Sequence, residues 1–194
     1  MRHVDESTTK LSYSKDVMNE YSIGDLKLFD LRNFPDQRGN LLAVNFEELS
    51  LDLGIKQFVQ TNVASSHRGV IRGMHWQNEP NTQGKLIIVL SGSIIDIAID
   101  IKPNSSTFGQ FTSVEMDEKK QKAFWIPPGF AHGFQTVSPK SKVIYLVDAP
   151  FDLDCSDGIN PLDAELSLPW DSSIVPILSL KDRTAANFSQ RFSQ

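Results

Sequence analysis

The sequence predicts an all-β protein of the sandwich or barrel class. Short segments alternate apolar and polar residues, and turn signals separate them about every eight to twelve residues. Almost no segment carries the apolar stripe of a long helix. With 194 residues, of which 40% are hydrophobic, the chain can form one domain with a sizeable core. We expect a polar arm over residues 1–19 and a single domain over residues 20–194.

The N-terminal part of the chain predicts strands, one turn and one helix. PDQRGN (35–40) has the composition of a turn. FEELSLDLG (46–54) is the best short helix candidate, and Gly54 is expected to end it. Strand character is expected over residues 23–31, 41–46 and 57–66.

The middle of the chain predicts a strand ending near His75, a loop, and a second strand beginning near Lys85. This arrangement would place an imidazole and an ammonium at the mouth of one sheet. The SGS at 91–93 is a hairpin turn signal. After it, isoleucines alternate with Asp96, Ala98 and Asp100. We assign the two aspartates to the outer face of that strand.

The remaining strands are expected in TFGQFTSVEM, KAFWIPPG, HGFQTV and SKVIYLVDAPF. The tail from about Cys155 is rich in loop residues, and SLKDRTAANFSQRF (179–192) is expected to form a short closing helix.

Composition narrows the class of function. The formal net charge of −5 argues against a general nucleic-acid binder. The single cysteine, Cys155, rules out an intrachain disulfide framework and fits a reducing interior. The N-terminal segment lacks the apolar core of a signal peptide, and no run approaches the ~20 apolar residues that span a bilayer. We therefore expect a cytoplasmic protein that binds neither nucleic acid nor membrane.

Two histidine-bearing segments are the strongest chemical signal. RGMHWQNEPNTQGK (72–85) places His75 and Lys85 at the two ends of a loop, and WIPPGFAHGF (125–134) carries His132 among aromatics and glycines in an expected strand-to-strand connection. A histidine takes a proton near neutral pH, and a nearby lysine stabilises the resulting anion. A lone histidine beside a tryptophan is often only a core residue. Two such segments together predict a common pocket.

These segments resemble the dTDP-4-dehydrorhamnose 3,5-epimerase family. RGMHWQ, QGK, GSIIDIAIDI, SSTFGQF, WIPPGFAHGF, VIYLVD and LSLKD occur there in the same order and at similar spacing, covering about Asp25 to Asp182. The resemblance implies a cupin-type jelly roll. It also implies epimerisation of a nucleotide-linked 4-keto-6-deoxy sugar at C3, C5 or both, without a metal or organic cofactor. A homodimer, in which N-terminal residues enter the neighbouring site, is implied as well.

By this resemblance, His75 is the general base and Tyr145 the general acid. Asp182 orients His75, and Lys85 stabilises the enolate oxygen. The positions that match substrate-binding residues of the family are Arg38, Gln60, Asn62, Arg72, His132 and Lys181. A base and an acid are both needed because one group cannot sit on both faces of the same carbon.

Other interpretations of these residues stay open. Tyr145 could be an ordinary strand tyrosine, Asp182 a helix cap and Lys181 a solvated side chain. Many cupins bind a metal, but their usual His-x-His pair is missing here. A ketoisomerase of nucleotide sugars on the same fold and a non-catalytic sugar-binding cupin are the competing functions.

The chain also departs from the pattern of the family. Three family carboxylates are replaced by Ala43, Thr61 and Ser156. The positions after the expected acid, where many members have a lysine and then a tyrosine pair, hold Leu146, Pro150 and Phe151. We expect these changes to alter which sugar is accepted, or to restrict inversion to one carbon.

Overall fold

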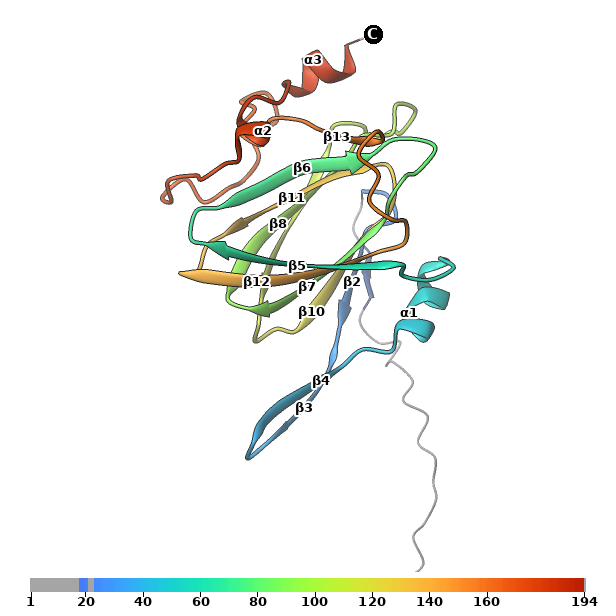
Figure 1. Ribbon diagram of the computed structural model, residues 1–194, viewed down its shortest axis with the longest axis vertical. Coiled ribbons are helices and arrows are strands. Elements are labelled where there is room, and N and C mark those ends of the chain that lie inside the picture. Colours follow the sequence, from blue (N-terminus) through green and yellow to red (C-terminus); the bar gives the residue numbers. More distant parts are fainter. Residues whose placement is uncertain (1–17, 21–22, 194) are drawn as a thin grey trace, which may run out of the picture.

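The computed structural model describes residues 18–20 and 23–193, and it confirms the all-β class. Two antiparallel sheets pack face to face in a cupin-type jelly roll (Figure 1). One has the strand order β1-β2-β10-β7-β12-β5, the other has the order β13-β6-β11-β8-β9, and β3 and β4 form a separate hairpin.

The six-stranded sheet consists of β1 (Met18–Glu20), β2 (Lys27–Asp30), β10 (Lys122–Ile126), β7 (Lys85–Ser91), β12 (Lys140–Val147) and β5 (Gln60–His67). The five-stranded sheet consists of β13 (Ser156–Gly158), β6 (Ile71–Gln77), β11 (Phe130–Thr136), β8 (Ser93–Asp100) and β9 (Phe111–Asp117). The hairpin strands are β3 (Arg32–Asp36) and β4 (Gly39–Ala43), and the helices are α1 (Phe46–Leu53), α2 (Leu180–Arg183) and α3 (Phe188–Phe192).

The period of two in the strands divides their side chains between the interior and the outer faces. On β7, Ile87 and Val89 belong to the core between the sheets, whereas Leu86 and Ile88 pack on the outer face. Lys85 shares the parity of Ile87, so its side chain begins on the inner face. The same rule places polar side chains of β5, β11 and β12 inside the jelly roll, where Ala64, Phe134 and Val143 of those strands belong to the same core.

Each sheet has part of its outer face covered. Helix α1 packs against the six-stranded sheet through Leu49. Asn45 caps its start, and Gly54 ends it as predicted, with φ of 67°. The C-terminal segment covers the five-stranded sheet, and Phe192 stacks on Trp76 with ring centroids 5.7 Å apart. The tail forms two short helices, α2 and α3, rather than the single closing helix expected.

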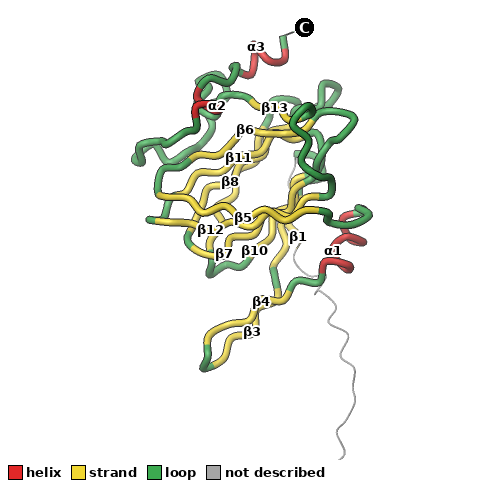
Figure 2. Tube along the Cα trace, viewed as in Figure 1, coloured by secondary structure: helices red, strands yellow, loops and turns green. Residues whose placement is uncertain are grey.

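The β3–β4 hairpin stands away from the body of the molecule (Figures 1 and 2). Phe34 and Leu41 on it are 47% and 66% exposed. The expected polar arm lies outside the described residues up to position 17, and residues 18–20 form β1 beside β2. No helix of the described part of the chain is long and apolar enough to cross a membrane.

Three local predictions were wrong, because the sequence pattern does not say which sheet a strand joins. The turn at 91–93 does not close a hairpin: β7 pairs with β10 and β12, whereas β8 pairs with β9 and β11, so the turn connects the two sheets. For the same reason His75 and Lys85 lie on facing sheets rather than on one sheet. His132 lies within β11, not in a connection.

The assignment of Asp96 and Asp100 to an outer face was also wrong. Both are fully buried. The isoleucines that alternate with them face outward, where the C-terminal segment covers Ile97 and Ile99. The aspartate face of β8 is therefore the inner one.

Candidate active site

A cleft of about 520 Å³ opens between the two sheets. Eight of the ten predicted site residues line it, and they come from β5, β6, β7, β11, β12 and α2: Gln60, Asn62, Arg72, His75, Lys85, His132, Tyr145 and Lys181. Asp182 lies directly behind His75, and Arg38 lies elsewhere. Residues separated by more than a hundred positions thus meet at one site.

His75 and Asp182 form a hydrogen-bonded pair at the wall made by β6. His75 Nε2 lies 2.6 Å from Asp182 Oδ1, and the carboxylate is almost fully buried while the imidazole is partly exposed to the cleft. Burial acts to raise the pKa of Asp182, but the hydrogen bond with His75 and the nearby charges outweigh it and leave that pKa below its ordinary value. An ionised Asp182 accepts the Nε2 proton, so Nδ1 is the nitrogen left to take a proton from a substrate.

Local sequence explains how this pair is held. Ser179 caps α2 by accepting a hydrogen bond from the Asp182 amide, so Asp182 itself is not the cap. Gly158 of β13 lies opposite His75 in the strand register. A Cβ at Gly158 would come within 3.0 Å of His75 Cδ2, so the glycine leaves room for the imidazole.

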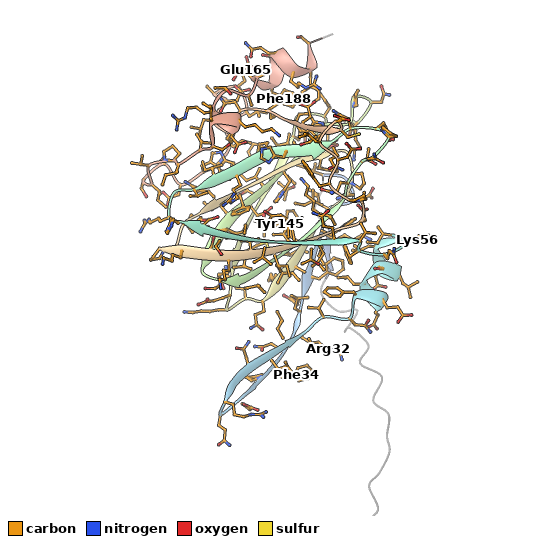
Figure 3. The ribbon with its side chains drawn as sticks, in the orientation of Figure 1. Arg32, Phe34, Lys56, Tyr145, Glu165 and Phe188 are labelled. Atoms are coloured by element: carbon orange, nitrogen blue, oxygen red, sulfur yellow. The ribbon has the colours of Figure 1, made fainter. Side chains whose placement is uncertain are left out.

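Tyr145 approaches the cleft from the other sheet. It lies on β12, packs against the interior core, and appears between β5 and β6 in Figure 3. Burial raises the pKa of its phenol, and the charge of Arg72 opposes that rise only in part. The hydroxyl therefore stays protonated at neutral pH. Arg72 is held by its Nε, which donates to Ser66 Oγ at 3.0 Å.

Lys85 lies between these two walls. Its Nζ donates to the carbonyl oxygen of His75 at 2.9 Å, which fixes the ammonium beside the base. Burial lowers the pKa of Lys85 to about 8, although the charge of Asp96 opposes that change. An ammonium has three donors, so two remain for an oxygen in the cleft.

A second histidine–aspartate pair lies deeper, and its acidic member was not predicted from the sequence pattern. His132 Nε2 lies 2.9 Å from one carboxylate oxygen of Asp96 and 3.0 Å from the other, and both residues are buried. The signal available in the sequence was the charge itself, since an aspartate in a strand of isoleucines needs a partner if its face is buried.

The rim of the cleft is built from side-chain amides and one lysine. Gln60 donates to Asn62 Oδ1 at 2.8 Å and accepts from the amide of Phe151 at 3.0 Å, which ties the loop after β12 to β5. Lys181 Nζ lies 3.5 Å from the hydroxyl of Ser156.

Arg38 does not reach this cleft. It lies at the tip of the β3–β4 hairpin and pairs with Asp36, and its side chain is 85% exposed. Within residues 18–20 and 23–193, no group of three or more His, Cys, Asp or Glu side chains is arranged to hold a metal ion.

Comparison with known proteins decides the family. The sequence model of the dTDP-4-dehydrorhamnose 3,5-epimerases matches residues 20–190. The chain belongs to the dTDP-4-dehydrorhamnose 3,5-epimerase family. A family member from Salmonella typhimurium is 35% identical over 179 residues, which are 90% of this chain and 96% of that protein. One from Methanothermobacter thermautotrophicus is 37% identical over 77% of this chain and 82% of its own length.

Solved structures agree with this family assignment. The epimerase of Legionella pneumophila, in complex with dTDP-4-keto-L-rhamnose, is 35% identical with a TM-score of 0.83, covering 88% of this chain and 92% of its own. The 3'-monoepimerase ChmJ of Streptomyces bikiniensis, in complex with dTDP-quinovose, is 28% identical with the same TM-score, covering 89% of each chain. The family fold thus includes enzymes named for one epimerisation and for two.

Proposed function

We propose that this protein epimerises a nucleotide-linked 4-keto-6-deoxy sugar at C3, C5 or both. The observation that carries the proposal is the placement of a paired histidine and a protonated tyrosine on facing walls of one cleft, with an ammonium between them. A protein that only binds a sugar does not need a base and an acid on opposite walls of its cleft.

The mechanism follows from the acidity of a C–H bond next to a ketone. Nδ1 of His75 removes the proton from one face, and the electron pair moves onto the C4 oxygen as an enolate. Lys85 donates hydrogen bonds to that oxygen, an interaction that contributes several kcal/mol in an enclosed site. Tyr145 then gives its proton to the opposite face, which inverts the carbon. Asp182 stabilises the imidazolium formed in the first step.

The cleft also suits a diphosphate. Arg72, Lys85 and Lys181 bring positive charge to its walls, while the carboxylates of Asp96 and Asp182 are each paired with a histidine. Guanidinium and ammonium groups are the usual partners of phosphate oxygens. The Legionella relative holds a dTDP-linked keto sugar, which supports a dTDP-linked substrate here.

Only some of the residues that depart from the family pattern lie where they can contact the substrate. Ser156 and Phe151 line the cleft. Ala43 lies on the hairpin, and Thr61 has the parity of the outer face of β5, between the inward Gln60 and Asn62. Ser156 and Phe151 are therefore the positions through which we propose that this enzyme selects its sugar or limits inversion to one carbon.

A homodimer is part of the proposal. Arg38 lies on a projecting two-stranded hairpin with exposed apolar side chains, and such a hairpin is marginally stable unless another surface packs on it. A second copy of the chain supplies that surface, and the hairpin then brings Arg38 to the partner's cleft.

The function is tested by incubating the protein in D2O with dTDP-, CDP-, UDP- and GDP-linked 4-keto-6-deoxyglucose. NMR then follows deuterium entry at C3 and C5, and the product is identified by its coupling constants. Deuterium entry with inversion at one carbon or both is expected for at least one nucleotide. Migration of the carbonyl would instead identify a ketoisomerase, and no exchange with any of the four would refute the proposal.

A further inference from the structure

One buried carboxylate has no role in the reaction as described. Asp96 is 0% exposed and lies on the inner face of β8, between the core residues Ile94 and Ala98. Burying an ionised carboxylate is costly unless it is paired and hydrogen-bonded. An uncharged side chain would pack in that layer without this penalty, so the charge calls for an explanation.

Strand register brings Asp96 to the back of the active site. Asp96 lies opposite Phe134, and His132 lies two residues before Phe134 on the same face of β11. Such diagonal neighbours are within reach of each other, and both oxygens of Asp96 lie within hydrogen-bond distance of His132 Nε2, at 3.0 and 2.9 Å. His132 in turn lies opposite His75 and lines the cleft.

We propose that Asp96 is a positioning residue of this site, which orients His132 toward the substrate and keeps Lys85 in its ammonium form. The proposal rests on the proposed function. By accepting the Nε2 proton, Asp96 fixes the tautomer of His132 and leaves Nδ1 for a sugar hydroxyl. Its negative charge favours a positive charge on Lys85, which the enolate oxygen requires.

Among the charged groups near Lys85, Asp96 is the one whose charge acts to raise the Lys85 pKa. The titratable groups that line the cleft with Lys85 are His132 from β11, Arg72 and His75 from β6, Tyr145 from β12 and Lys181 from α2. Asp96 lies behind His132 on β8. Asp182 lies behind His75. Burial lowers the pKa of Lys85, and the charge of Asp96 is what opposes this. Burial raises the pKa of Asp96, against the charges of His132 and Lys85. Loss of Asp96 would therefore lower the pKa of Lys85 further.

The same strand offers a matched control. Asp100 lies four residues further along the inner face of β8 and is also fully buried. Its partners are the hydroxyls of Ser105 and Thr107, at 2.5 and 2.7 Å, the Lys102 amide at 3.0 Å and the Lys102 ammonium at 3.8 Å. These groups lie outside the cleft, so Asp100→Asn changes a buried charge on β8 without touching Lys85.

The experiment compares Asp96→Asn and Asp100→Asn with the wild-type enzyme through two readouts. One is the dependence of kcat and KM on pH. The other is the pH dependence of Lys85 modification by trinitrobenzenesulfonate, read by mass spectrometry of the Lys85 peptide, because only a neutral amine reacts. The second readout needs no substrate, so it stays informative if the proposed function fails.

For Asp96→Asn, the ratio of kcat at pH 6.5 to kcat at pH 8.5 is expected to rise about sixfold, as a fall of one unit from a Lys85 pKa of about 8 implies. The midpoint of Lys85 modification is expected to move to lower pH. Asp100→Asn should lower the melting temperature but leave both readouts unchanged. Asp96→Ser serves as a second neutral variant if the first does not fold. A wild-type midpoint and pH profile in a folded neutral variant would overturn the proposal.

Discussion

His75 and Asp182 lie 107 positions apart in the sequence, and a 2.6 Å hydrogen bond makes them one chemical unit. The imidazole alone could rotate or present the wrong tautomer. With the ionised Asp182 on Nε2, only Nδ1 is available to the substrate. Substitution of either residue should therefore slow proton abstraction, although to different degrees.

His75→Asn is expected to abolish deuterium entry into the substrate, because amides do not take protons near neutral pH. Asp182→Asn should lower the exchange rate by about 10²-fold or more, because the imidazole is misoriented and its charged form is no longer stabilised. The rates are measured by NMR in D2O, with circular dichroism to verify folding. Exchange at the wild-type rate in His75→Asn would show that another group is the base.

Deprotonation of Lys85 is expected to set the upper pH limit of activity. Burial lowers its pKa to about 8, and in the proposed mechanism only the ammonium form stabilises the enolate. As the pH rises through that value, kcat should fall, whereas Tyr145, with its raised pKa, still holds its proton. Lys85→Met should lower kcat by about 10² to 10³-fold and abolish this limb of the profile. A limb that persists unchanged in Lys85→Met would assign it to another group.

The individual residues differ in how far the sequence predicted them. His75, Lys85 and His132 stood out because titratable groups among aromatics and glycines are unusual in strands. Asp96 was placed on the wrong face, because a strand with isoleucines on one side looks amphipathic. Here both faces are buried, one by the opposite sheet and one by the C-terminal segment, which local alternation cannot show.

At the scale of elements, the loop between β12 and β13 is held in place by side-chain amides. Gln77 accepts from the Asp152 amide at 2.8 Å and donates to the carbonyl of Pro150, while Gln83 donates to the carbonyl of Ala149 at 2.6 Å. Phe151, which lines the mouth of the cleft, is positioned by these contacts together with Gln60.

Gln77→Leu should therefore loosen this rim and raise KM about tenfold while changing kcat less, as expected when only substrate binding is weakened. Faster hydrogen exchange at the Asp152 amide would report the loss of its partner directly. Gln77→Glu keeps the acceptor but loses the donors, so its KM should lie between the values of the wild-type enzyme and Gln77→Leu. An unchanged KM in the leucine variant, with the loop amide still protected, would show that the loop does not depend on Gln77.

The strands and α1 could be predicted from sequence because they follow from local chemistry. Period-two alternation marks strands, and Asn45 and Gly54 lie at the two ends of α1. The pairing of strands could not, because the turn at 91–93 fits either a hairpin or a connection between sheets. The meeting of α2 with β6 depends on how the whole tail packs, and only the family resemblance indicated it.

At the scale of the whole molecule, we expect each subunit to contribute Arg38 of its hairpin to the cleft of the other subunit. If Arg38 acts in the partner's cleft, Arg38→Ala and His75→Asn damage different sites of a mixed dimer. Each variant alone should be strongly impaired. A mixture refolded together should recover about a quarter of wild-type activity, since half of the dimers are mixed and each has one intact site. No gain on mixing, or a monomer mass by light scattering at full activity, would contradict this.

In the proposed mechanism, proton removal and proton return occur from opposite walls of one cleft. The most direct test is Tyr145→Phe, assayed by NMR in D2O with the nucleotide sugar that the wild-type enzyme inverts. His75 can still remove a proton and return deuterium to the same face. We therefore predict that deuterium enters with retained configuration, while inversion falls by about 10² to 10⁴-fold. Inversion at the wild-type rate, or loss of exchange and inversion together in a folded variant, would contradict the account.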